Sequence, residues 1–253
     1  MRRGVSPRDV DLLLGDLAGG RSLAWLISHG EEPFDEAPLA AMLARRYAGE
    51  PLQYIRGRTE FFSRSFLVDS RALIPRPETE ILVEAAIERA PRGARVVDVG
   101  TGSGCIAVSL ALERPDLHVV GVDRSLDALA LASLNGRLLG SRAFFAASDL
   151  LEAIRSFDVV VSNPPYIPAA EVETLAPEVR DWEPRMALTP GARGTEIIDR
   201  IFAAAGRALV LLEIGYGQEP RIRELAAAHG RRVDAVLSDL AGIPRVVVSS
   251  AAS

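Results

Sequence analysis

From residue 76 onward, short apolar segments alternate with longer segments of helical periodicity. The predicted strands are 95–99, 118–122, 157–162, 208–214, 232–237 and 245–249, with a weaker candidate at 143–146. The predicted helices are 78–89, 106–113, 126–139, 195–206 and 219–229. Apolar strands separated by helices are typical of a parallel sheet covered on both faces. The sequence therefore predicts an α/β fold with a seven-stranded sheet. The loop before the last strand is too short for a crossover helix, which makes the last strand antiparallel.

The first 75 residues follow other patterns. Over residues 1–58, apolar side chains recur at three- and four-residue spacings, which predict short amphipathic helices. Two short β-type runs follow at 59–62 and 65–68, and they predict a hairpin with Ser63 and Arg64 at its turn. The chain is therefore divided into a helical domain at 1–58, a β-hairpin linker at 59–75 and an α/β domain at 76–253.

The composition excludes several classes of protein. The 253 residues include 29 basic and 34 acidic side chains, and the net charge of −5 argues against a broad basic surface for nucleic acid. The single cysteine excludes an internal disulfide framework, and the three histidines lie too far apart for a metal site. No apolar run reaches the roughly 18 residues of a membrane span, and acidic residues interrupt the N-terminus where a signal peptide needs an apolar core. We expect a soluble, cytoplasmic protein that binds no metal ion and no membrane.

The first candidate site is a glycine-rich loop directly after the predicted strand 95–99. Its residues are Gly100, Thr101, Gly102, Ser103 and Gly104. Glycines in this place let the backbone turn tightly and approach a ligand at the N-terminus of the next helix. The spacing G-x-G-x-G differs from the G-x-G-x-x-G of nicotinamide cofactors. Taken alone, the loop is also consistent with a tight turn that binds nothing.

Two acidic side chains follow the next two strands. Asp123 ends its strand, where a carboxylate can accept both ribose hydroxyls of an adenosine bound across the strand ends. Its alternative role is the N-cap of the following helix, which Ser125 can fill equally well. Asp149 can bond an adenine amino group, or it can cap the stretch 150–154. We include Leu150, beside it, among the expected cofactor contacts.

The most informative motif is Asn163-Pro164-Pro165-Tyr166, which follows the predicted strand 157–162. Two consecutive prolines have no N–H and keep the preceding residues out of the helical region, so we expect the Pro164 carbonyl to point outward without a partner. Beside it, Asn163 offers an amide oxygen. Two adjacent acceptors can bind both hydrogens of an NH2 group on a planar carbon, and Tyr166 supplies an aromatic face for a planar group to stack on.

These motifs together resemble the HemK/PrmC family, the N5-glutamine methyltransferases of class I peptide chain release factors. The segment 74–80 reads IPRPETE as in that family, and the resemblance runs from about residue 40 to 249 but is weak over the first forty residues. The stretch 189–195 reads TPGARGT, where the family usually has a glycine-rich stretch ending in Asp-Gly. The resemblance implies a Rossmann-like sheet that binds S-adenosyl-L-methionine. It also implies methyl transfer to the glutamine of a Gly-Gly-Gln motif in a release factor.

The resemblance also implies roles for individual residues. The catalytic and substrate-binding residues are Asn163, Pro164, Pro165 and Tyr166. The cofactor contacts are Gly100, Thr101, Gly102, Ser103, Gly104, Asp123, Asp149, Leu150 and Asn163. For the IPRPETE segment two interpretations stay open: Glu78 or Glu80 lines the mouth of the cofactor site, or Thr79 and the glutamates start and cap the helix 80–89.

Two other functions stay open on the residues alone. The Asn-Pro-Pro-Tyr motif fits any planar amino group, so a nucleic-acid methyltransferase acting on adenine N6 or guanine N2 is an alternative. Such an enzyme would normally need a positive groove. Residues 1–58 are neutral, with eight arginines and eight acidic side chains, and the rest of the chain carries the net charge of −5. A non-catalytic cofactor-binding subunit would usually show decay of the motifs. We therefore expect a release factor as the partner, docked by the helical domain, and no direct contact with nucleic acid.

Overall fold

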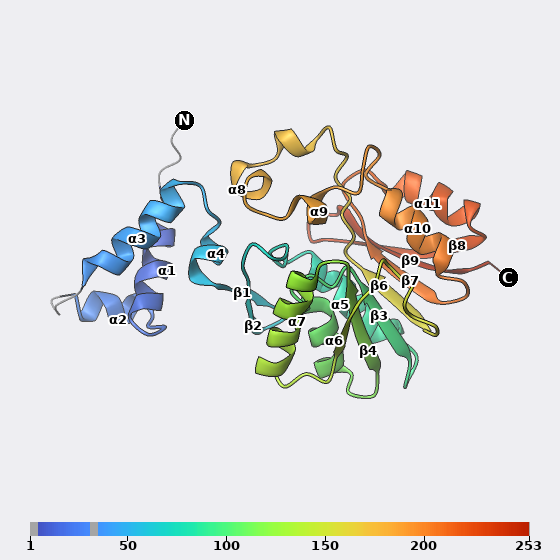
Figure 1. The fold of residues 1–253 in the computed structure, drawn as a ribbon, viewed down its shortest axis with the longest axis horizontal. Helices are drawn as coiled ribbons and strands as arrows, with labels where there is room; N and C mark the ends of the chain where they lie inside the picture. The colour runs from blue at the N-terminus through green and yellow to red at the C-terminus, as the bar shows by residue number, and fades with distance from the viewer. Residues whose placement is uncertain (1–4, 31–34, 253) are drawn as a thin grey trace.

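The computed structural model describes residues 5–30 and 35–252, and its largest part is a seven-stranded mixed sheet (Figure 1). The strands of this sheet are β3 (Arg95–Val99), β4 (His118–Asp123), β5 (Phe144–Ala147), β6 (Val159–Ser162), β7 (Leu209–Glu213), β8 (Arg231–Ser238) and β9 (Pro244–Ala251). Their order across the sheet is β5-β4-β3-β6-β7-β9-β8. The first five pair in parallel, whereas β9 is antiparallel to both of its neighbours. The predicted fold class is confirmed.

Five helices cover the two faces of the sheet, and three shorter ones lie in the connection after β6. The helices are α5 (Thr79–Arg89), α6 (Cys105–Glu113), α7 (Leu126–Leu138), η1 (Val172–Thr174), α8 (Pro177–Arg180), α9 (Arg185–Leu188), α10 (Glu196–Ala204) and α11 (Glu219–Ala228). The five long helices agree with the sequence prediction to within two residues at each end. The three short ones were not predicted, because three- and four-residue helices are too short to show a periodicity.

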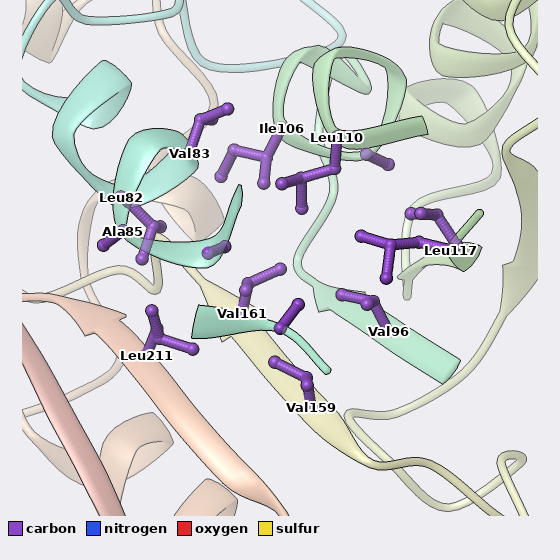
Figure 2. Packing of buried hydrophobic residues seen from close by; sticks show 14 of the residues in the cluster. Leu82, Val83, Ala85, Val96, Ile106, Leu110, Leu117, Val159, Val161 and Leu211 are labelled. Carbon is purple, nitrogen blue, oxygen red and sulfur yellow. The ribbon is translucent and has the colours of Figure 1, made fainter. Parts of the chain in front are cut away.

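Alternate residues of each strand pack against opposite layers of helices. Val96 belongs to the core cluster that also holds Ile106 and Leu110 of α6, all three labelled in Figure 2, whereas Val97 belongs to the cluster on the other face, with Ile198 of α10 and Ile222 of α11. All four residues of β6 are buried, as expected for a central strand covered on both faces. Since β3, β4 and β6 are parallel neighbours, the loops after them meet at one edge of the sheet. That edge carries the candidate site.

The N-terminal helices lie beside the α/β domain, at the end of the molecule opposite to the C-terminus (Figure 1). They are α1 (Pro7–Leu17), α2 (Leu23–Ser28), α3 (Glu36–Tyr47) and α4 (Leu52–Arg56). Ser6, Ser22 and Asp35 cap the first three by accepting a backbone N–H with their side chains. A link to the α/β domain comes from Arg46, which bonds the carboxylates of Asp9 and Glu178 at 2.9 and 3.0 Å.

A hairpin of β1 (Arg58–Phe61) and β2 (Arg64–Leu67) connects the helices to the sheet domain. Its turn is Phe62-Ser63, so the predicted turn at Ser63 and Arg64 was wrong by one residue. Both turn residues have positive φ, at 48° and 57°, which is the geometry of a two-residue hairpin turn. The Glu80 carboxylate accepts the Phe62 N–H at 2.7 Å and holds this turn, a contact that local sequence does not indicate.

Over 5–30 and 35–252, no helix is long and apolar enough to cross a membrane. Within the same ranges, no group of three or more His, Cys, Asp or Glu side chains is arranged to hold a metal ion.

Candidate active site

A cavity of about 250 Å³ opens at the carboxyl ends of β3, β4 and β6. Nine of the twelve predicted site residues line it: Gly100, Thr101, Gly102, Ser103, Asp123, Leu150, Asn163, Pro164 and Pro165. The other three, Gly104, Asp149 and Tyr166, do not. We call the side formed by Gly100–Ser103 and Asp123 the glycine-loop wall. The side formed by Thr79 and Asn163–Pro165 is called the Asn163 wall.

The glycine-loop wall is held by its own backbone. Gly100 and Gly102 have φ values of 72° and 54°, a region that side chains disfavour, and both positions need glycine for this reason. The N–H groups of Gly100 and Thr101 both donate to the Val122 carbonyl at 2.9 Å, which ties the loop to the end of β4. No atom lies within 4 Å of the place where a Cβ of Gly100 would project, so a ligand can approach the backbone there.

Gly104 serves helix packing and does not line the cavity. It precedes α6 with a φ of 83°, and a Cβ added to it would lie 3.0 Å from the Cβ of Ala132 on α7. Its small size therefore lets α6 and α7 approach each other. Close helix packing thus explains why residue 104 is glycine, and a cofactor contact at Gly104 stays a prediction.

Asp98, in the strand β3 that precedes the loop, also holds the glycine loop in place, and the sequence analysis did not identify it. Its Oδ2 accepts the Thr101 hydroxyl at 2.6 Å and the Ala107 N–H at 3.2 Å. Burial raises the pKa of Asp98 to about 7, and Oδ1 has no hydrogen-bond partner among the described residues. An acidic residue within an otherwise apolar strand was the signal that could have identified it.

Asp123 ends β4 with its carboxylate directed at two backbone N–H groups. Oδ2 accepts from Gly102 at 3.0 Å and Oδ1 accepts from Ser125 at 2.9 Å. The N-cap of α7 is Ser125, whose hydroxyl oxygen accepts the Ala128 N–H at 3.1 Å. The capping alternative for Asp123 is therefore wrong, and its carboxylate lies at the cavity.

The structure separates Asp149 from Leu150. Leu150 lines the cavity with a φ of 52°, whereas the Asp149 carboxylate forms an ion pair with Arg200 at 2.9 Å. The hydrogen bond from Arg200 lowers the pKa of Asp149. Residues 150–153 form turns and not a helix, so the capping alternative for Asp149 is wrong. Its predicted bond to adenine is untested, and the carboxylate is engaged away from the cavity.

The Asn163 wall is organised by side chains from three elements. The Asn163 amide nitrogen donates to the Thr79 hydroxyl oxygen at 3.0 Å, and the Thr79 hydroxyl donates to Oε2 of Glu213 at 2.6 Å. Thr79 begins α5, Glu213 ends β7, and each is 2% exposed. Because the Asn163 nitrogen is engaged in this way, its amide oxygen is left for the cavity. Among residues 5–30 and 35–252, no group donates to the Pro164 carbonyl, as predicted.

Tyr166 lies away from the cavity wall. Its ring packs against Gly215, where an added Cβ would lie 3.0 Å from Cδ2, and its carbonyl accepts from the Gln218 side chain at 2.9 Å. Burial raises the pKa of Tyr166 to about 12. The stacking of a planar group on Tyr166 stays a prediction, and the residue does not line the cavity.

For the IPRPETE segment, the interpretation that Glu78 or Glu80 lines the mouth of the site is wrong, whereas the interpretation that Thr79 and the glutamates start the following helix is confirmed, though without a side-chain cap. Glu78 and Glu80 do not line the cavity, and Glu80 holds the hairpin turn instead. The N-cap position of α5 is Glu78, and no side chain caps this helix. The residue at the cavity is Thr79, with Arg76 beside it.

Arg76 has a buried partner on the connection after β6. It forms an ion pair with Glu183, whose side chain is 1% exposed. Burial raises the pKa of Glu183, and Arg76 opposes this effect. The pair crosses 107 residues of sequence, so no local pattern could have indicated it.

Two family models match the chain. The model of the methyltransferase small domain matches residues 77–178, and that of the PrmC N-terminal domain matches residues 3–57. The second match extends the similarity over the first forty residues, where the motifs alone showed little resemblance.

Curated relatives and solved structures agree with these models. Release factor glutamine methyltransferases of Koribacter versatilis and Geobacter sulfurreducens are 46% and 43% identical, over 85% and 86% of this chain and 78% and 80% of theirs. A methyltransferase from Pyrococcus furiosus shares the fold, with a TM-score of 0.57 and 13% identity over 87% of this chain and all of that one.

Proposed function

The chain belongs to the family of release factor glutamine methyltransferases, and we propose that its Asn163 wall holds the substrate amide during methyl transfer. The enzyme uses S-adenosylmethionine as methyl donor. The acceptor is the side-chain N5 nitrogen of the glutamine in the Gly-Gly-Gln motif of class I release factors. One observation carries the proposal: the consecutive residues Asn163 and Pro164 both line the cavity, and within residues 5–30 and 35–252 no group donates to the Asn163 amide oxygen or to the Pro164 carbonyl.

The paired acceptors match the hydrogens of a carboxamide. A carboxamide nitrogen is a poor nucleophile because its lone pair is delocalised into the carbonyl group. The site must therefore work chiefly by alignment, which can supply about 7–11 kcal/mol of a barrier. Asn163 and Pro164 accept one N–H each, which fixes the plane of the amide and the direction of its nitrogen. An ester or acid without these hydrogens would leave both acceptors unpaired, at about 1–3 kcal/mol each.

The glycine-loop wall fits S-adenosylmethionine. The Asp123 carboxylate can accept the ribose hydroxyls, and the open space beside Gly100 lets the ligand lie against the backbone. Apolar side chains complete the lining, among them Ala72, Ile106 and Leu150, and can contact the flat face of adenine. When bound, the cofactor supplies a methyl group on a positively charged sulfur.

The N-terminal helices are the proposed docking surface for the release factor. The α3 helix has no buried residue, and Ile27 and Tyr47 are 75% and 66% exposed. Exposed apolar side chains of this kind are suited to a protein partner. The match of the PrmC N-terminal domain model over residues 3–57 supports this role.

A labelling experiment tests the function. The purified protein is incubated with methyl-labelled S-adenosylmethionine and one of four substrates: a class I release factor, the same factor with its loop glutamine replaced by glutamate, duplex DNA, or RNA. We expect label on the unmodified release factor alone, because glutamate has the same length without the nitrogen. Label on nucleic acid would favour an amino methyltransferase of bases. Equal label on both release factors would refute the assignment to the loop glutamine.

A further inference from the structure

Glu213 is a buried carboxyl group that the proposed function leaves without a role. It stands at the end of β7, next to β6 in the sheet, and is 2% exposed. Burying a carboxyl group is unfavourable unless its partners compensate, so its place behind the site calls for an explanation. Its Oε2 accepts from the Thr79 hydroxyl at 2.6 Å, and the Thr79 oxygen in turn accepts from Asn163 at 3.0 Å.

The direction of these hydrogen bonds follows from the chemistry of the three groups. An ionised carboxylate can only accept, so the Thr79 hydroxyl must donate its single hydrogen to Glu213. The Thr79 oxygen then has only lone pairs left to offer Asn163, and it can bond the NH2 end of that amide alone. The amide oxygen of Asn163 consequently faces the cavity.

Without the hydrogen bond to Thr79, the side-chain amide of Asn163 would have no preferred orientation of its oxygen and nitrogen. The oxygen and nitrogen of an asparagine amide are nearly equal in size, so hydrogen-bond partners decide which one points where. In the reversed orientation, Asn163 would present NH2 to the NH2 group of a substrate amide, and two donors would face each other. A group that fixes the orientation therefore decides whether the site accepts or repels its substrate.

We propose that Glu213, acting through Thr79, is a positioning residue that holds the Asn163 amide with its oxygen toward the substrate nitrogen. The inference rests on the proposed function of Asn163 and deepens it. Glu213 and Thr79 act through Asn163: Glu213 is outside the cavity lining, and Thr79 lines the cavity beside Asn163.

The ionisation of Glu213 sets the direction of the chain of hydrogen bonds. A protonated Glu213 has an O–H that can donate to Thr79, which would release Thr79 to donate to Asn163 and reverse the amide. Burial, the largest effect, raises the pKa of Glu213 to about 7; Glu78 adds to this shift, whereas hydrogen bonds from Thr79 and Asn163 and the charge of Arg245 oppose it. The titratable and charged groups facing Glu213 from neighbouring elements are Glu78, Arg245, Tyr166 and Cys105. The methyl-transfer rate should therefore fall as the pH drops through about 7.

Thr79→Val and Thr79→Ser form the first test, measured as single-turnover methyl transfer at saturating cofactor. Valine keeps the shape without the hydroxyl, and we expect the rate to fall by about 10- to 100-fold, the range for a lost hydrogen bond to a charged group. Serine keeps the hydroxyl and should retain most of the rate. In both variants the calorimetric Kd for S-adenosylmethionine should stay within about twofold, because the hydroxyl acts on Asn163. A valine variant as fast as wild type would overturn the proposal.

The Asn163→Ala background separates a positioning role from a purely structural one. If Thr79 acts through Asn163, Thr79→Val should cost nothing further once Asn163 is alanine. The same loss in both backgrounds would mean that Thr79 supports the fold, and the proposal would fail. A fully active Asn163→Ala variant would instead remove the proposed function of Asn163. The two failures are thus distinguishable.

The second test is the pH dependence of the methyl-transfer rate in Glu213→Gln. It remains available if Thr79→Val fails to fold. Glutamine keeps the shape but can donate to Thr79 at any pH, so we expect a low rate with no rise through pH 7. The matched control is Glu224→Gln on α11, an exposed position far from the cavity lining, which should keep the wild-type profile. A Glu213→Gln variant with the wild-type rate and acid limb would contradict the proposal.

Discussion

The two walls of the cavity are built in different ways. The glycine-loop wall consists of residues 100–103 and Asp123, with Asp98 as a support, and its hydrogen bonds to these two carboxylates span 3 and 21 residues of sequence. The Asn163 wall depends on side chains from three elements, whose hydrogen bonds span 84 and 134 residues of sequence. We infer that the first wall sets how tightly the cofactor binds and the second sets how fast the methyl group is transferred.

The difference also has an energetic side. On the glycine-loop wall the backbone makes the contacts, so close packing around the glycines is what can be damaged. On the Asn163 wall a buried carboxylate directs the chemistry, and its burial is unfavourable whenever it is ionised. The glycine-loop wall should therefore be the more sensitive to added volume, whereas protonation can act on both walls, through Asp98 on the first and Glu213 on the second.

The largest expected effect is that of Gly121→Ala in β4, behind the glycine loop. An added Cβ would lie 2.5 Å from Oγ1 of Thr101 and 2.8 Å from Cδ1 of Phe145, so the loop must shift and the bond from Thr101 to Asp98 is lost. We expect the free energy of unfolding to fall by about 3 kcal/mol or more in urea titrations. Gly30→Ala is the control, since its nearest atoms are 3.7 Å away. Equal stabilities of the two variants would refute the packing argument.

The second effect concerns the pH dependence of stability. The pKa values of Asp98 and Glu213 are both raised to about 7, mainly by burial. A raised native pKa means that the folded state binds the proton more tightly than the unfolded state. Each protonated carboxyl group therefore adds to the free energy of unfolding. This contribution is fully present below the pKa of the unfolded state and is lost as the pH rises through about 7.

Glu213→Gln measures this contribution directly. Between pH 5 and pH 8, wild type should lose about 3 kcal/mol of unfolding free energy relative to the variant. The variant should therefore gain stability relative to wild type over this range and still be the slower enzyme, a combination that a purely structural role of Glu213 does not predict. The exposed Glu224→Gln serves as control, and a pH dependence shared by all three proteins would count against the burial argument.

The smallest of these effects is that of Asp123→Ala on the glycine-loop wall. Removing the carboxylate deletes the acceptor of the Gly102 and Ser125 N–H groups and the proposed ribose contact. We expect the binding free energy for S-adenosylmethionine to weaken by about 1.5–3 kcal/mol, which raises the calorimetric Kd by about 10- to 150-fold, with the rate at saturating cofactor little changed. Asp123→Asn keeps one acceptor oxygen, so its Kd should lie between those of wild type and Asp123→Ala. An unchanged Kd in both variants would contradict the ribose assignment.

Much of the fold could be predicted because it depends on local patterns. The strand 95–99 was predicted to the residue, since its apolar side chains and the following glycines are contiguous. The antiparallel last strand followed from the length of one loop. The hairpin turn was misplaced by one residue because Glu80, eighteen residues away, holds Phe62 in the left-handed region.

The same distinction separates the predicted site residues from the missed ones. The glycine loop and Asn163 stand in contiguous motifs that end buried strands, and the structure places them on one cavity. Thr79 and Glu213 come together only through the order of strands in the sheet, which the sequence does not display. Asp149 shows the converse: its position fits a cofactor contact, but Arg200 from α10 engages its carboxylate.

The most direct measurement compares Asn163→Ala with wild type by calorimetry with S-adenosylmethionine and by single-turnover methylation of a release factor at saturating cofactor. The account predicts a Kd within about twofold of the wild-type value and a rate lower by about 100-fold or more, because the variant keeps the glycine-loop wall and loses an acceptor needed for alignment. A variant that binds the cofactor weakly but transfers methyl groups at the wild-type rate once saturated would contradict the division of labour between the two walls.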